Sequence, residues 1–316
     1  WAVLVNLLCV CQSQNEDLIR TVAYPYPLSL SFNNITHSEI NGSFMSDSPT
    51  GGNFYRTLTL HDGKLFVGGR SQLFSVSTED LSLSENVTGF PDTTNNVKNY
   101  VTVIQPIGDN LLVCGTFISS NGRPYCRQHP SRNMSAAGPT KEQENKAITA
   151  SAHNQNTSWL LVNDTGGSDY HVYVGSELEK DQLLSVTKAD IKVNDLAVDI
   201  SINLSSFISR TYLDEPQFVG DPIDYNGRIY FFFREYATEH INAGRIVFSR
   251  VARVCKNEAG GPIFTDLLNK FVTFGKARLA CSIAGTFYYN DIQDVYQSAT
   301  DPNVVYAIFT TERMDS

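Results

Sequence analysis

The chain has 316 residues, of which 41% are hydrophobic and 18% charged, so it can bury a substantial core in one large all-β domain or in two ordinary domains. Its 24 Lys and Arg residues against 33 Asp and Glu residues give a net charge of −9, without a long basic run. Because nucleic acids and anionic membranes are bound by clustered Lys and Arg, this composition argues against both as partners.

The amino-terminal segment begins with Trp1 rather than Met and is mostly apolar as far as Cys11, after which residues 12–17 are polar. A run of about eleven apolar residues is too short to span a bilayer, which needs ~20. It is typical of the apolar core of a secretory signal that has lost its basic start. We therefore predict that residues 1–14 are a signal-peptide remnant and that residues 15–316 form the folded domain. A buried strand at the start of the fold is the alternative.

Five strand-like segments recur along the chain, rich in apolar and aromatic residues: 64–68, 111–115, 171–175, 228–232 and 304–308. Turn dipeptides such as Asp62-Gly63 and Asn226-Gly227 precede them. The fifth positions of successive segments are separated by 47, 60, 57 and 76 residues. This period is typical of a four-stranded propeller blade with loop insertions, and such blades must stack around an axis to bury both faces. A pair of β-sandwiches is the competing fold, but it has a strand about every 8–12 residues and lacks this recurrence.

The sequence therefore predicts an all-β fold, a β-propeller with about five blades. The glycines Gly68, Gly115 and Gly175 end the first three segments and indicate strands that pass near the crowded central channel, where a side chain would collide. The last segment stops, near Ser316, where a blade should continue. We therefore expect an incomplete ring with open sheet edges and an exposed apolar face.

Apart from Cys9 and Cys11 in the predicted signal segment, two of the six cysteines are close in sequence. Cys114 and Cys126 close a short loop that holds Asn121-Gly122, a hairpin-turn dipeptide, and we predict a disulfide there worth ~3 kcal/mol. Two neighbouring reduced thiols are the alternative. No Cys-x-x-Cys pair occurs and the six His are scattered, so we expect neither a metal site nor a cofactor.

Seven Asn-x-Ser/Thr sequons lie in polar, turn-like stretches and are predicted glycosylation sites: Asn34, Asn41, Asn86, Asn133, Asn156, Asn163 and Asn203. Together with the signal segment and the cysteine pair, they favour an oxidising, extracellular compartment, with the protein either secreted or at the cell surface.

Motifs for catalysis are missing from the sequence. It has no Gly-x-Ser-x-Gly elbow, no His-Glu-x-x-His and no Gly-x-x-x-x-Gly-Lys loop. We therefore expect a binding protein that is not an enzyme and takes no small-molecule substrate. A propeller glycoside hydrolase with two catalytic carboxylates is a remote alternative, although no Ser-x-Asp-x-Gly repeat marks one.

Several stretches resemble the sema domain of semaphorins, among them Asp-Glu-Pro-Gln-Phe-Val-Gly at 214–220 and Lys-Ala-Arg-Leu-Ala-Cys-Ser at 276–282. The other similar stretches are residues 55–60, 112–116, 228–235, 252–261 and 291–296. The resemblance covers about residues 20–316. Plexins and hepatocyte-growth-factor-type receptors also carry sema domains, but their version lacks the Lys-Ala-Arg-Leu stretch, so the semaphorin branch is preferred.

The resemblance implies a seven-bladed propeller in the parent protein, of which this chain holds the first part. It also implies homodimers that bind plexin receptors through the propeller surface and so guide axons and other migrating cells. A plexin-type or growth-factor-receptor-type ectodomain is the alternative function. The resemblance further implies that Cys255 and Cys281 pair with cysteines beyond residue 316, so here we expect both to be unpaired, or else joined to each other.

The run Phe231-Phe232-Phe233 is followed by Arg234 and Glu235. An aromatic run that ends in a charged pair could anchor an interface. We interpret it instead as a central strand with both faces buried, whose two charged residues mark the exit to solvent.

Candidate partner-binding residues lie in two segments. The stretch 210–215 precedes a strand and is rich in Tyr and Arg, which make good hot spots, and in a propeller it falls in a loop that links blades. The second segment, residues 239–242, is a polar turn that precedes the next predicted strand. The predicted contact residues are Arg210, Tyr212, Asp214, Glu239 and His240. Ordinary loops are the alternative.

Overall fold

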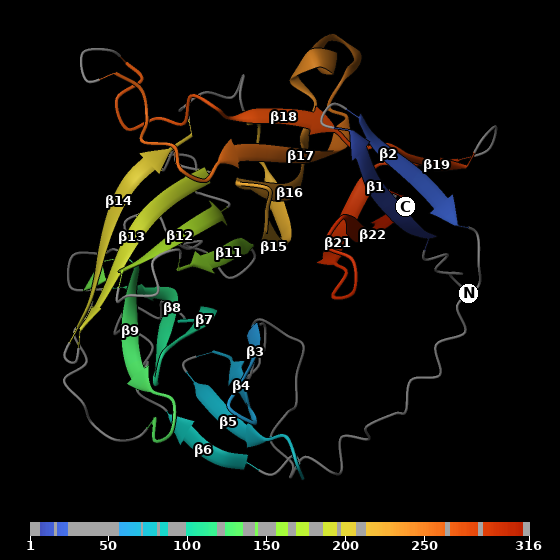
Figure 1. Cartoon of the computed structure of the whole chain (residues 1–316). Coiled ribbons are helices and arrows are strands. Elements are labelled where there is room, and N and C mark those ends of the chain that lie inside the picture. Colours follow the sequence, from blue (N-terminus) through green and yellow to red (C-terminus); the bar gives the residue numbers. More distant parts are fainter. Residues whose placement is uncertain are drawn as a thin grey trace.

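The computed structural model describes residues 7–15, 18–24, 57–70, 72–80, 83–87, 99–118, 124–134, 143–144, 156–163, 169–176, 186–194, 197–206, 213–262, 266–283 and 287–311. They form five four-stranded antiparallel sheets, which follow one another in an arc (Figure 1). The predicted all-β propeller with about five blades is confirmed. In the described part of the chain, no helix has the length and apolar character needed to cross a membrane.

In the first four blades the strands follow one another in chain order. Blade 1 consists of β3 (Thr57–His61), β4 (Lys64–Gly68), β5 (Leu73–Ser77) and β6 (Leu83–Val87). Blade 2 consists of β7 (Val101–Ile107), β8 (Asn110–Ile118), β9 (Pro124–Pro130) and β10 (Gln143–Glu144). Blade 3 consists of β11 (Thr157–Val162), β12 (Asp169–Ser176), β13 (Val186–Asn194) and β14 (Ala197–Ser205). Blade 4 consists of β15 (Gln217–Tyr225), β16 (Arg228–Tyr236), β17 (Val247–Cys255) and β18 (Gly275–Arg278).

Blade 5 combines strands from both ends of the described chain. Its order is β2-β1-β22-β21, so β22 (Val304–Thr310) lies between β21 (Asp291–Gln297) and β1 (Leu7–Asn15), and β2 (Leu18–Tyr24) is outermost. Figure 1 shows these blue and red strands side by side. Residues 7–15 therefore form a strand of the fold, as the alternative interpretation of the amino-terminal segment predicted. The signal-peptide interpretation of residues 1–14 concerns processing and stays a prediction, and residues 1–6 lie outside the described ranges.

The recurring sequence segment corresponds to one position in every blade. Each of the five segments lies on the second strand: β4, β8, β12, β16 and β22. The first strands, β3, β7, β11, β15 and β21, contact one another from blade to blade. The turn predictions are also confirmed, because Asp62-Gly63 and Asn226-Gly227 have φ of 48°, 69°, 49° and 71°, the left-handed values that tight hairpins require.

The glycines at the ends of β4 and β12 avoid a collision, as expected, but at a different place. A Cβ on Gly68 would lie 2.5 Å from Val101 Cγ1, and one on Gly175 would lie 2.4 Å from Phe218 Cδ1. Val101 and Phe218 belong to the first strands of the following blades. The prediction of a strand beside the central channel is therefore wrong for these two positions, because the glycines instead let the second strand pack against the next blade.

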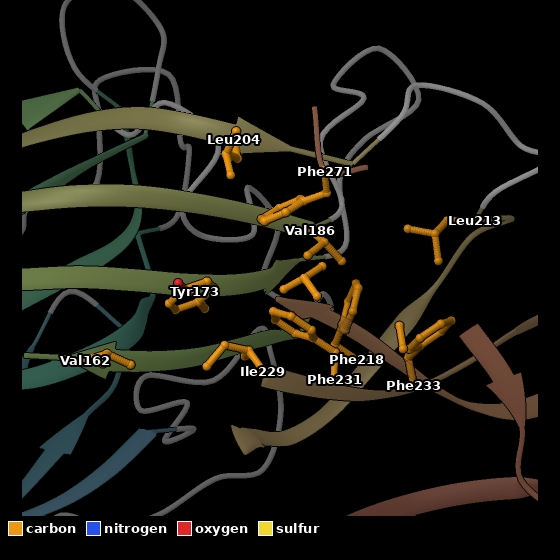
Figure 2. Packing of buried hydrophobic residues seen from close by; sticks show 12 residues of the cluster. Val162, Tyr173, Val186, Leu204, Leu213, Phe218, Ile229, Phe231, Phe233 and Phe271 are labelled. Carbon is orange, nitrogen blue, oxygen red and sulfur yellow. The ribbon is translucent and has the colours of Figure 1, made fainter. Parts of the chain in front are cut away.

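Aromatic side chains fill the interface between blades 3 and 4. Figure 2 shows Phe218, Phe231 and Phe233 of blade 4 gathered beside Tyr173 of blade 3. The ring of Phe218 lies 5.2 Å from that of Phe233 and 6.3 Å from that of Phe231, centroid to centroid. Phe232 points to the opposite face of β16, where it packs in the cluster between blades 4 and 5. The prediction of a central strand with both faces buried is confirmed.

The two blades at the ends of the arc expose apolar side chains. On β3 the hydroxyls of Thr57 and Thr59 donate to Val101 O (3.1 Å) and Ile104 O (2.8 Å) of blade 2. Leu58 and Leu60 alternate with these threonines and are 66% and 68% exposed. On β21 of blade 5, Tyr296 is 63% exposed. The exposed apolar face that the sequence predicted is present on blade 1.

Candidate partner-binding surface

Two segments emerge at the same end of blade 4. Gln217, at the start of β15, lies opposite Arg234 of β16, and Tyr236, at the end of β16, lies opposite Val247 of β17. Because the strands are antiparallel, residues 213–216 before β15 and the β16–β17 connection lie at one edge of the sheet. The connection contains a short 3₁₀ helix, Thr238–Ala243.

A buried carboxylate lies beneath these segments. The side chain of Glu235 is 0% exposed, and its Oε1 lies 3.0 Å from Arg250 Nε and also accepts from Lys276 Nζ. Its Oε2 accepts from the backbone N–H of Asp214 at 3.1 Å. The prediction that Glu235 marks an exit to solvent is wrong, because two cations and a backbone donor offset the cost of burying its charge.

Arg250 extends this network to the surface. Its side chain is 7% exposed, and its Nη2 donates to both carboxylate oxygens of Glu239, at 2.6 and 2.7 Å. Burial alone would raise the pKa of Glu239, but the hydrogen bonds from Arg250 and the charges of Arg250 and Lys276 outweigh it and lower that pKa below its ordinary value. The chain of contacts from Asp214 through Glu235 and Arg250 to Glu239 thus joins the two predicted segments.

A second contact joins the same segments at the surface. Arg245 Nη2 lies 2.8 Å from Glu215 Oε1, and the Arg245 guanidinium carbon lies 4.0 Å from the centroid of the Tyr236 ring. The hydrogen bond and charge of Glu215 raise the pKa of Arg245. His240 is exposed, and its ring packs edge-on against Phe248, with 5.2 Å between the ring centroids.

The structure thus places three of the five predicted contact residues, Asp214, Glu239 and His240, at one end of blade 4. Arg210 and Tyr212 lie outside the described residues. Sequence reasoning missed Arg250 and Lys276. A signal for Arg250 was present, since a cation that points into the core from a largely apolar strand such as β17 needs a buried acidic partner.

The predicted disulfide between Cys114 and Cys126 is confirmed, and it joins directly opposed residues of β8 and β9. The turn at Asn121-Gly122 lies outside the described residues. Cys255 is free, as predicted. The expectation for Cys281 is wrong: it is disulfide-bonded, to a partner that is not among the side chains described. Its strand β19 (Cys281–Ile283) pairs with β20 (Phe287–Tyr289) and lies against β2, a segment that the sequence argument had not placed beside it.

The predicted glycosylation sites stay predictions. Asn133 and Asn163 are exposed and Asn156 is half-buried. The remaining four are Asn34 and Asn41, outside the described residues, and Asn86 and Asn203, on strands whose side chains at these positions are not described. Within the described ranges, no group of three or more His, Cys, Asp or Glu is arranged to hold a metal ion.

Known proteins similar to this chain are semaphorins, although no family model matches it. Semaphorin-2A of Drosophila melanogaster is 33% identical over 296 residues, which cover 82% of this chain and 39% of the relative. Human Semaphorin-5A is 31% identical over 278 residues, which cover 81% of this chain and 24% of the relative. The chain therefore spans well under half the length of these relatives.

Solved structures agree with the sequence relatives. The structure of Drosophila Semaphorin 2a matches with a TM-score of 0.67 and 29% identity, covering 83% of this chain and 46% of that one. A structure of Drosophila Plexin A in complex with Semaphorin 1b matches with a TM-score of 0.60 and 27% identity, covering 84% of this chain and 50% of that one. With about 30% identity over four-fifths of its length and the same propeller architecture, this chain belongs to the semaphorin family.

Proposed function

We propose that this chain is part of an extracellular guidance ligand that binds a plexin-type receptor through the surface of its propeller and catalyses no reaction. The observation that carries the proposal is the similarity, at 27% identity and a TM-score of 0.60, to a structure of a plexin in complex with a semaphorin. The Cys114–Cys126 disulfide and the predicted sequons support an extracellular location.

The geometry favours the end of blade 4 as the contact surface. Residues 213–216 and the β16–β17 connection are held from below by Glu235 and Arg250, and the exposed Arg245–Glu215 pair also lies between them at the surface. Segments that are fixed before binding lose less conformational entropy when a partner docks. The surface also presents Tyr and Arg side chains, the residue types that contribute most to protein interfaces.

We further propose that the ligand acts as a homodimer that brings two receptors together. Linking two binding surfaces raises the effective concentration at the second site, so a dimer holds a pair of receptors more firmly than a monomer does. A monomeric variant of the full-length protein should therefore bind a single receptor yet fail to signal. A monomeric variant that still signals would contradict the bivalent mechanism.

The test is binding of the full-length protein to immobilised plexin ectodomains, measured by surface plasmon resonance. We expect saturable binding that weakens by about tenfold when Glu239 and His240 are both replaced by alanine, the size of effect typical of an interface hot spot. The matched control is Glu79→Ala, because Glu79 is an exposed acid on blade 1, far along the arc. No binding of the wild-type protein to any plexin ectodomain would refute the proposal.

A further inference from the structure

Arg278 occupies an unusual position at the outer edge of blade 4. It ends β18, directly opposite Arg250 of β17. Its guanidinium carbon lies 3.5 Å from the centroid of the Phe248 ring and 4.9 Å from that of the Tyr288 ring. Phe248 is 6% exposed and Tyr288 38% exposed, so the guanidinium rests on one buried ring and one ring at the surface. Such stacking restrains an exposed side chain that would otherwise sample many rotamers.

The charges around Arg278 leave it without an acidic partner. Glu235 is engaged by Arg250 and Lys276, and Glu239 is engaged by Arg250. Two carboxylates therefore face three cations in this cluster, and within the described part of the chain the side chain of Arg278 forms neither an ion pair nor a hydrogen bond. The excess positive charge of the cluster lies on Arg278.

Arg245 provides the internal comparison. It is also exposed, and its guanidinium carbon is also stacked on an aromatic ring, that of Tyr236, at 4.0 Å. Unlike Arg278, it has an acid of its own chain, Glu215, at 2.8 Å. Both arginines thus pack on an aromatic ring, but only Arg245 also has a carboxylate of its own chain as a partner among the described residues.

We propose that Arg278 binds the carboxylate of an Asp or Glu side chain of the partner protein, on the surface assigned above to receptor binding. The two rings contact the guanidinium without accepting hydrogen bonds from its N–H groups, so in the described part of the chain these groups are available for a bidentate pair with a carboxylate. Because the rings already restrain the side chain, little of its freedom is lost on binding. The exposed ring of Tyr288 shields one side of the pair from water.

The surroundings favour a single carboxylate over a polyanion such as a sulfated glycan. The chain has a net charge of −9, and the partly exposed Glu239 belongs to the same cluster. A multiply charged chain would be repelled by both, whereas one acidic side chain at the centre of a protein interface meets Arg278 alone.

The experiment compares variants of the full-length protein for binding to a plexin ectodomain and therefore rests on the proposed function. We expect Arg278→Ala to weaken binding by about tenfold or more, as is typical of a hot-spot arginine. Arg278→Lys should recover only part of this loss, because lysine keeps the charge but not the bidentate geometry. Arg278→Glu should bind more weakly than Arg278→Ala, because it sets two carboxylates against each other. The matched control, Arg132→Ala, should stay within about twofold of wild type, because Arg132 is an exposed arginine that follows β9 of blade 2, outside the proposed surface, and lies 3.7 Å from Asp109 of its own chain.

Each outcome has one meaning. If the wild type binds and Arg278→Ala binds equally well, this inference is wrong and the proposed function stands. If Arg278→Glu binds as well as Arg278→Ala, the partner group is not a carboxylate and the inference is also wrong. If the wild type does not bind, the proposed function fails together with the inference. Unchanged thermal unfolding of all variants verifies that the fold is intact.

Discussion

The two halves of blade 4 are made of the same strands but are held together differently. Toward the middle of β16, Phe231 and Phe233 pack with Phe218 in a cluster of buried hydrophobic side chains. Two residues beyond Phe233, on the same face of the strand, Glu235 is equally buried but is held by Arg250 and by other polar groups. The apolar half is stabilised by the burial and close packing of hydrophobic side chains, which many combinations of residues can provide. The polar half is stable only if each buried charge has an oppositely charged or hydrogen-bonding partner within contact distance. We expect substitutions in the apolar half to affect stability most, and those in the polar half to affect both stability and the geometry of the binding surface.

The largest effect should come from the apolar half. Replacing Phe233 by alanine removes a side chain that is 0% exposed, and such core truncations cost about 3–5 kcal/mol. The loss should appear as a lower midpoint in chemical denaturation. Leu58→Ala is the control, since this apolar side chain is 66% exposed and its truncation should leave the midpoint nearly unchanged. An equal loss from both variants would contradict the assigned packing.

The next largest effect should come from the polar half. Glu235→Ala would leave Lys276 without its acidic partner and Arg250 with Glu239 alone, and breaking comparable buried pairs costs about 3 kcal/mol. Glu235→Gln keeps the shape and should lie between the wild type and the alanine variant in the same denaturation assay. A neutral effect of Glu235→Ala would mean that water reaches the two cations and that the network does not hold the segments.

A buried histidine in blade 2 makes the stability of the fold depend on pH. Burial of His129 lowers the pKa of its imidazole below 6.5, and the charge of Arg127 lowers it further, while a hydrogen bond with the Met134 backbone acts in the opposite direction. Below pH 6.5 the unfolded chain binds a proton that the folded chain does not, so stability should fall as the pH drops from 7 toward the lowered pKa. His129→Gln should flatten this part of the profile of unfolding free energy against pH. An unchanged slope would assign the acid sensitivity to other groups.

The smallest effect should come from the exposed counterpart of the buried network. Arg245 and Glu215 are 62% and 51% exposed, and ion pairs at such positions are largely screened by water. Arg245→Ala should therefore leave the denaturation midpoint within error of the wild type, at low and at high salt. A clear loss would show that this pair, and not Glu235, holds the two segments together.

Much of this fold was predictable because its signals are local. The five recurring segments were identified from residues within a few positions of one another, and all five lie on second strands. The disulfide between Cys114 and Cys126 spans only 12 residues and was predicted from that spacing and a turn dipeptide. Strand alternation, tight turns and short loop closure depend on neighbouring residues, so the sequence shows them directly.

The candidate surface was only half predictable. Asp214, Glu239 and His240 were identified as loop residues of suitable chemistry, but their common location depends on the register of blade 4. The prediction that Glu235 lies at an exit to solvent was wrong, because its burial depends on Lys276, which lies 41 residues away in the sequence. The prediction that Cys281 is unpaired or joined to Cys255 was wrong for a similar reason, since β19 packs against β2 from the other end of the chain.

The sequence by itself determined that this chain forms short antiparallel strands in repeated groups, where the groups begin, and which family they resemble. The tertiary structure decided which charges are buried, which arginines have an acidic partner and which stand open. The physical reason is that a strand is encoded by alternation over a few residues, whereas a charge can be buried only if partners from distant strands repay its lost hydration.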